Sequence, residues 1–223
     1  MSDFTLNHLF IRKVPEVQNP RFAEPLAEEA DLLEGFLNNY RTREAKILRD
    51  PGLTNTGRSK AVRRSQEAAR EALPEATAEP VGLLKKRLGW AEKLLERRTM
   101  ILPGEGPMED VLEKEKEIRD LARTLRPEDV VDRYLECCRA ADTVAVRAFE
   151  NAPPSFPLLT PEQIAEGAEI HAQARFPEEY EELVQARAAI NHAEWNMRRA
   201  LAEFRPPPPT PQELVEAAQA ASQ

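Results

Sequence analysis

The chain has 223 residues, of which 41% are hydrophobic, 31% charged and only 6% aromatic. With a mean hydropathy of −0.57, this composition predicts amphipathic helices in one or two domains and argues against a compact α/β enzyme. No stretch approaches the ~20 apolar residues of a membrane span, and the adjacent Cys137 and Cys138 cannot build a disulfide framework. We therefore expect a cytoplasmic protein with no membrane partner.

The net charge of −8 is unevenly distributed along the chain. Residues 1–40 carry three basic and seven acidic side chains, a net −4. Residues 41–98 carry fifteen basic and eight acidic side chains, a net +7, whereas residues 99–223 carry thirteen and twenty-four, a net −11. A basic middle inside an acidic chain predicts charge pairing within or between chains, or contact with an acidic partner.

Residues 1–25 are expected to form an N-terminal arm, because three prolines interrupt apolar residues that follow no helical period. Such an arm either docks onto its own body or a neighbour, or packs loosely. A first strong helix is predicted over residues 26–49, where apolar side chains recur at alternating steps of four and three. That spacing is typical of a seam between long helices.

The second predicted helix, residues 55–73, has a mainly alanine face, and the third, residues 81–102, restores the heptad spacing. Residues 26–102 are thus expected to form a hairpin-like helical region with a basic middle. Alanine buries little area, so part of the apolar stripe is expected to meet another chain. The residues predicted at this association seam are Leu33, Leu37, Leu84, Leu88 and Leu95.

Residues 103–205 are expected to form an acidic helical region that begins with a Pro-Gly-Glu-Gly-Pro break. Its predicted helices cover residues 109–126, 127–150, 160–175 and 177–204, and the second is the most apolar and the candidate core helix. Residues 206–223 start with four prolines, which predict a polyproline spacer before a short tail helix. No alternating strand pattern occurs. The predicted fold is therefore an all-α, extended multi-helix bundle with heptad-type seams and proline-rich linkers.

Motifs for catalysis or metal binding are missing from the sequence. Helical di-metal sites need Glu-x-x-His, but alanine stands three residues before both His171 and His192. Cys137 and Cys138 have the wrong spacing for zinc and lie in an apolar helix, where cysteine behaves as a small hydrophobe. We therefore expect no enzyme activity, no cofactor and no metal.

The best candidate contact site is the basic stretch within residues 58–64. It could contact phosphate or an acidic protein surface, or it could pair with the acidic half of the chain. Basic side chains at the third helix extend the set. The predicted contact residues are Arg58, Lys60, Arg63, Arg64, Lys85 and Lys86.

Residues 48–61 read LRDPGLTNTGRSKA. This stretch resembles a helix–turn–helix join in small helical proteins of tailed-bacteriophage structural gene clusters. Those often read Asp-Pro, Leu-Thr, two residues, Gly-Arg or Gly-Lys, and then a helix rich in Ala, Glu and Arg. The resemblance implies a virion assembly or accessory role, as scaffold, head or tail component, and location in the virion. The tail carries Glu213 and Glu216 where scaffolds often end in a basic coat-binding helix, which counts against that subtype.

We therefore expect a non-enzymatic structural or interaction protein that associates with itself or with protein partners. The alternative is a nucleic-acid-associated regulator that uses the basic helix at residues 58–64.

Overall fold

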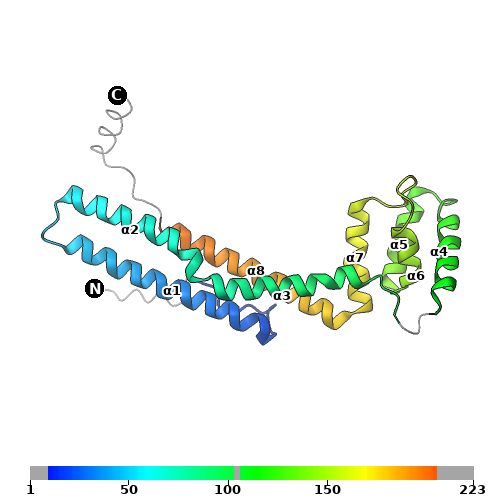
Figure 1. Cartoon of the computed structure of the whole chain (residues 1–223), viewed down its shortest axis with the longest axis horizontal. Coiled ribbons are helices and arrows are strands. Elements are labelled where there is room, and N and C mark those ends of the chain that lie inside the picture. The colour runs from blue at the N-terminus through cyan, green and yellow to red at the C-terminus, as the bar shows by residue number, and fades with distance from the viewer. Residues whose placement is uncertain (1–9, 103–105, 205–223) are drawn as a thin grey trace, which may run out of the picture. The chain divides into compact units, whose positions relative to one another are not determined.

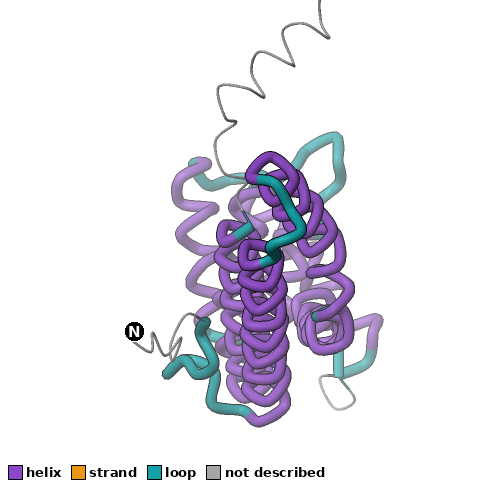
Figure 2. Tube along the Cα trace, turned by 90° about the vertical axis from the view of Figure 1, so that its left-hand side faces the viewer, coloured by secondary structure: helices purple, strands orange, loops and turns teal. Residues whose placement is uncertain are grey.

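The computed structural model describes residues 10–102 and 106–204, and 78% of these described residues lie in eight α-helices. Within the same ranges no strand occurs, as the purple and teal tube of Figure 2 shows. The predicted all-α class is confirmed. No helix of the described part is long and apolar enough to span a membrane. The heptad seams stay a prediction.

The chain folds as two compact units, and Figure 1 labels the helices that form them. Unit 1 combines the chain up to Lys85 with the chain from Ala188 onward, and unit 2 comprises Lys86–Arg187. Unit 1 contains α1 (Pro20–Arg49) and α2 (Asn55–Ala76). Unit 2 contains α4 (Met108–Ala122), α5 (Pro127–Arg139), α6 (Thr143–Glu150) and α7 (Pro161–Arg175). Two helices contribute to both units, α3 (Ala78–Arg97) and α8 (Pro177–Glu203).

These units differ from the predicted regions, residues 26–102 and 103–205. The reason is that the end of α8 packs into the same core as α1, far from it in sequence. Residues 20–25 also differ from the predicted arm, because they form the first turns of α1. Proline is tolerated at the first helical position, and Asn19 caps the helix by accepting a hydrogen bond from the Arg21 amide (3.0 Å).

The core of unit 1 is built on the apolar stripe of α1. Tyr40 and Phe204 pack edge to face with ring centroids 4.8 Å apart, which anchors the end of α8 against α1. The helix α2 adds only a few large side chains, as its alanine content predicts. The buried cluster is formed by Phe10, Ala30, Leu33, Leu37, Tyr40, Leu73, Ala200 and Phe204.

The turn between α1 and α2 follows the sequence signals. The Thr54 hydroxyl accepts a hydrogen bond from the Gly57 amide (3.1 Å) and so caps α2. The Asp50 carboxylate accepts one from the Gly52 amide (2.8 Å), which closes the turn. Figure 1 shows the resulting antiparallel pair of α1 and α2.

The single helix predicted over residues 127–150 is wrong, because the structure divides it into α5 and α6. Ala141 adopts a φ of 54°, which ends α5. The Asp142 side chain then accepts a hydrogen bond from the Ala145 amide (3.0 Å) and caps α6. A positive φ is costly for residues other than glycine, so alanine at this position does not predict a helix end. The residues around the break include no glycine or proline that would have indicated it.

Unit 2 packs around Tyr134 of α5, whose side chain is fully buried. Gly167 of α7 lies directly against its ring, and a Cβ atom at Gly167 would overlap the Tyr134 ring and hydroxyl. Cys138, one helical turn after Tyr134, is also fully buried. The buried cluster is formed by Ala122, Val130, Tyr134, Cys138, Val146, Phe149 and Leu159.

We expect Gly167→Ala to lower the free energy of unfolding of unit 2 by about 2–3 kcal/mol, because the added methyl group overpacks a rigid contact. The matched control is Gly89→Ala in α3 of the same unit, where the new Cβ meets no atom within 4 Å. That change removes a glycine from a helix and should stabilise by about 0.5–1 kcal/mol. Urea unfolding followed by circular dichroism measures both, and equal effects would contradict the close Tyr134–Gly167 packing.

Candidate functional site

A groove on unit 2 is lined by α4, α5 and α6, and α6 packs against both of the other helices. The cavity measures about 510 Å³. Its apolar wall comes from α4, the segment directly after α4, and α6, whereas α5 contributes Cys137 and charged side chains. We call it the acidic groove. Its apolar lining consists of Ile118, Leu121, Ala122, Leu125, Ala145 and Phe149.

Two leucines at the edge of the acidic groove are exposed to solvent. Leu121 is 64% exposed and Leu125 is 39% exposed. Leu121 lies beside the buried Ala122, on the flank of α4 rather than on its inward stripe. Large apolar side chains that border a concave apolar surface are typical of interaction sites. The groove therefore offers apolar area to a ligand that covers both leucines.

The rim of the acidic groove carries four carboxylates and one guanidinium, which are Asp129, Asp132, Glu136, Asp142 and Arg133. Some of this charge is paired locally: Arg133 contacts Glu136 (2.9 Å) and Arg126 contacts Asp129 (2.9 Å). These ion pairs are exposed and stabilise the fold little. The rim thus keeps a negative balance of the kind that attracts a basic ligand.

Cys137 also lines the groove, but the thiol is a poor nucleophile there. Burial and the neighbouring Asp142 carboxylate raise its pKa, so the reactive thiolate is scarce at neutral pH. Burial raises the pKa of Cys138 to about 11. The thiols thus behave as small core side chains.

A charged centre lies inside unit 2, close to these helices. Arg98 donates to both carboxylate oxygens of Glu150 (2.7 Å each), and the Tyr134 hydroxyl donates to the same carboxylate (2.7 Å). A second buried carboxylate, Glu115, accepts from Arg147 (2.6 Å). A buried ion pair is costly to break, because one charge would remain without a partner. These contacts hold α4, α5 and α6 together with the end of α3.

Two buried acid–base groups of unit 2, His171 and Tyr134, have pKa values that are shifted away from neutral pH. Burial, with Arg98 and Arg175 nearby, lowers the pKa of His171 to about 4, so its imidazole is neutral. Burial and the hydrogen bond to Glu150 raise the pKa of Tyr134 above its ordinary range. Across residues 10–102 and 106–204, no group of three or more His, Cys, Asp or Glu side chains is placed to hold a metal ion.

The predicted basic residues have separate roles in the structure. Arg58 donates to the Asp50 carbonyl (2.7 Å) and so braces the turn between α1 and α2. Lys60 and Arg64 are exposed on α2, and Arg63 is half-buried. Lys85 lines an apolar groove of unit 1, of about 690 Å³, together with Arg198 and Met197 of α8. Lys86 lies over the Trp90 ring, 5.1 Å from its centroid.

The predicted seam leucines are mostly used within the chain. Leu33 and Leu37 lie in the core of unit 1, 0% and 1% exposed, and Leu84 is also fully buried. The structure corrects their predicted role, because side chains of the same chain already cover them and leave no face for another chain. Leu88 and Leu95 are half-buried.

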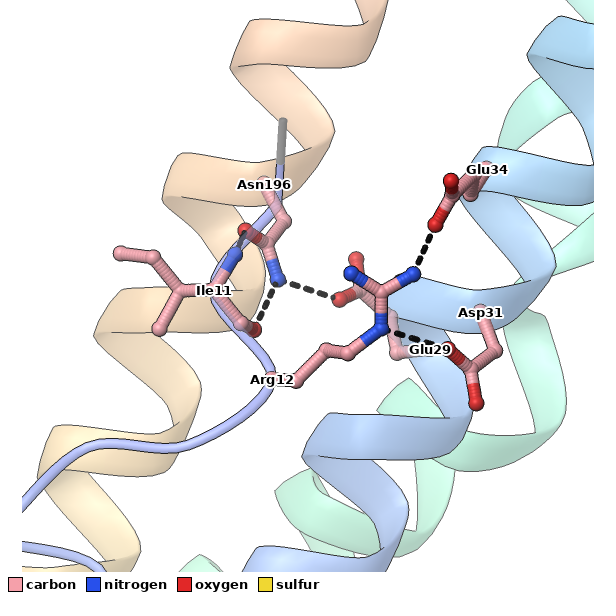
Figure 3. A network of polar contacts seen from close by, with 6 residues as sticks. All are labelled: Ile11, Arg12, Glu29, Asp31, Glu34 and Asn196. Carbon is pink, nitrogen blue, oxygen red and sulfur yellow. Dashed lines mark hydrogen bonds and ion pairs between the residues drawn. The ribbon is translucent and has the colours of Figure 1, made fainter. Parts of the chain in front are cut away.

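A second polar site, in unit 1, joins the arm to α1 and α8 (Figure 3). The Asn196 side chain accepts a hydrogen bond from the Ile11 amide (2.8 Å) and donates to the Ile11 carbonyl (3.0 Å). Its amide nitrogen also donates to the buried Glu29 carboxylate (2.8 Å). Arg12 contacts Asp31 (2.7 Å) and Glu34 on the exposed side. We call these six residues the arm clamp.

Sequence reasoning missed both sites. For the acidic groove, the available signal in the sequence was Leu121, a leucine that does not belong to the inward apolar stripe of α4. For the arm clamp the signal was a polar residue within an apolar stripe, as Glu29 is in α1 and Asn196 in α8. No protein-family model, curated protein or solved structure matches the chain.

Burial of Glu29 raises its pKa from 4.5 to about 7, against the smaller opposite effect of the Asn196 hydrogen bond. The groups of the clamp around it are Arg12, Asp31, Glu34 and Asn196. Because the pKa is higher in the folded state, the contribution of Glu29 to the free energy of unfolding is fully present below pH 4.5 and is lost as the pH rises to about 7. Glutamine does not titrate, so Glu29→Gln should lack this pH dependence. We therefore expect the free energy of unfolding of the variant, relative to wild type, to rise by up to about 3 kcal/mol between pH 4.5 and 8.

Chemical denaturation at a series of pH values measures this difference. The control is Glu28→Gln, which changes an exposed carboxylate one residue earlier in α1 and should follow the wild-type profile. A stability difference between Glu29→Gln and wild type that stays constant with pH would show that Glu29 does not titrate in this window.

Proposed function

We propose that the protein is a non-enzymatic interaction protein whose acidic groove binds a basic amphipathic helix of a partner protein. The observation that carries the proposal is Leu121, 64% exposed at the edge of a groove of about 510 Å³ with a carboxylate rim. An amphipathic helix laid in such a groove buries its apolar stripe against the leucines. Basic side chains on its flanks would then meet the carboxylates of the rim.

The wider role that we propose is assembly of, or accessory function in, a bacteriophage virion. Support comes from the resemblance of residues 48–61 to helical proteins of phage structural gene clusters. The structure of this segment, a capped turn between two helices, is compatible with that resemblance. Assembly proteins act by holding other chains, a task for which a groove is suited and for which no catalytic group is needed.

A second candidate function is nucleic-acid binding through the first half of α2. The residues from Asn55 to Gln66 include four basic side chains and no acidic one, and Lys60 and Arg64 are exposed. Positive side chains near a helix N-terminus add to its dipole and attract phosphate. A salt-dependent mobility shift that is lost in Lys60→Glu/Arg64→Glu would support this function.

The groove can be tested with a designed probe, a fluorescein-labelled helical peptide with a leucine stripe and arginine flanks. We expect binding measured by fluorescence anisotropy to weaken at least tenfold in Leu121→Asp, because the charge would be buried under the ligand. Asp132→Lys should weaken binding through the rim and reduce its dependence on salt. The half-buried Cys137 gives a second readout, since an occupied groove should slow its alkylation.

Two controls make the test specific. Leu112→Asp changes a leucine of α4 that is 51% exposed but does not line the groove, so binding should be unchanged. A peptide with the same leucine stripe and glutamate flanks should bind at least tenfold more weakly. Equal binding of the two peptides, or an equal loss in Leu112→Asp and Leu121→Asp, would contradict the proposed site.

A further inference from the structure

The arm clamp of unit 1 holds a piece of main chain. Asn196 satisfies both the amide and the carbonyl of Ile11, at 2.8 and 3.0 Å, which is the pair of hydrogen bonds that a neighbouring strand would make. Asn196 is fully buried, and its bond to Glu29 (2.8 Å) fixes the orientation of the amide. Both residues belong to helices, Glu29 to α1 and Asn196 to α8.

The side chains next to Ile11 give the site its selectivity. Phe10 is buried in the core cluster with Leu33, Ala200 and Phe204. On the other side, Arg12 contacts the carboxylates of Asp31 and Glu34, as Figure 3 shows. The clamp thus contacts three consecutive residues in different ways: the aromatic side chain of Phe10, the main chain of Ile11 and the guanidinium of Arg12.

We propose that the arm clamp also binds the arm of a second copy of this chain, so that two copies exchange arms. A second copy brings the same Phe10, Ile11 and Arg12, and every clamp contact in the exchanged pair equals the one within a single chain. Exchange of an identical element is a low-cost route to a dimer for this reason. The proposal is independent of the acidic groove.

The connector between the clamp and α1 permits the exchange. It comprises residues 13–19, which can span about 25 Å when extended. In the unexchanged chain a turn closes it, in which the Val17 amide donates to the Val14 carbonyl (3.1 Å) and Val17 is buried. Opening this turn costs this hydrogen bond, the one that the Gln18 side chain donates to the Pro15 carbonyl (3.2 Å), and the burial of Val17. All three can be regained once the arm has docked on the neighbour.

Concentration decides between the two arrangements. A short connector gives the arm an effective concentration on the order of millimolar at its own clamp. Dilute protein therefore keeps its own arm, whereas copies crowded in an assembly exchange. A pair of variants that cannot use their own arms would show the exchange at ordinary concentrations.

Charge reversal provides such a pair. In Arg12→Glu the arm is repelled by its own clamp, and in Asp31→Arg/Glu34→Arg the clamp repels its own arm. In an equimolar mixture both arms find a matching clamp on the other variant. We expect native mass spectrometry at micromolar concentration to show a 1:1 dimer in the mixture and monomers of each variant alone. The triple variant restores the match within one chain and should be monomeric.

Adding Asn196→Leu to both partners should abolish the mixed dimer, because the main-chain hydrogen bonds are lost. Absence of a mixed dimer between two folded variants would overturn the proposal.

The conservative variant Arg12→Lys provides a second measurement if charge reversal prevents folding. Nitrogen-15-labelled and unlabelled copies are mixed at millimolar concentration and treated with a zero-length carbodiimide, which joins the new amine to Asp31 or Glu34. Exchange predicts cross-linked peptide pairs in which one peptide is labelled and the other is not. With equal amounts of the two copies and complete random exchange, these mixed pairs should make up about half of all cross-linked pairs. Cross-links in which both halves always carry the same isotope would equally overturn the proposal.

Discussion

The hydrogen bond from Asn196 to Glu29 joins residues 167 positions apart and determines how α1, α8 and the arm fit together. Both side chains are fully buried, so each needs the other as a partner. Loss of either would leave a polar group in the core without a hydrogen bond, at a cost of about 1–3 kcal/mol or more. The pair specifies one register of α8 against α1 more strictly than alanine and leucine contacts could.

Unit 2 uses buried polar contacts in a similar way. Glu150 accepts from Arg98 and Tyr134, and Glu115 accepts from Arg147, which ties α4, α5 and α6 to the end of α3. In a chain with few aromatic residues, the core side chains differ little in shape, so side-chain packing alone distinguishes poorly between alternative helix arrangements. Directional hydrogen bonds supply that specificity. Their cost is desolvation, which is why the carboxylates are fully engaged rather than offered to a ligand.

Local signals in the sequence predicted the helices well, because those signals act within a few residues. Thr160 and Gln163 have the residue types and spacing of a capping box, and both of its hydrogen bonds form, at 2.8 and 3.3 Å. Threonine is a preferred N-cap residue, and Thr54 caps α2 directly after the turn at Asp50. The break at Ala141 could not be predicted, since the surrounding packing imposes an unfavourable φ there. The predicted seam also depended on tertiary packing. The periodicity of the sequence predicts that Leu33 and Leu37 are buried, but it does not indicate whether the same chain or another chain covers them.

The candidate sites depended on tertiary structure for a related reason. A stripe of apolar residues shows which face of a helix turns inward, whereas a groove depends on how much of the flank the neighbouring helices leave uncovered. Leu121 lies one position from the buried Ala122, and only the arrangement of α5 and α6 determines that it is exposed.

The covered seam changes where association is expected. Because Leu33 and Leu37 are covered inside unit 1, we place the proposed association at other surfaces. The two proposed surfaces, the acidic groove and the arm clamp, both combine a small apolar contact with directional polar groups. Contacts of this kind bind modestly one at a time, because little area is buried and ordering the ligand costs entropy. Their strength would come from repetition, since copies held side by side raise the effective concentration of every arm and every groove.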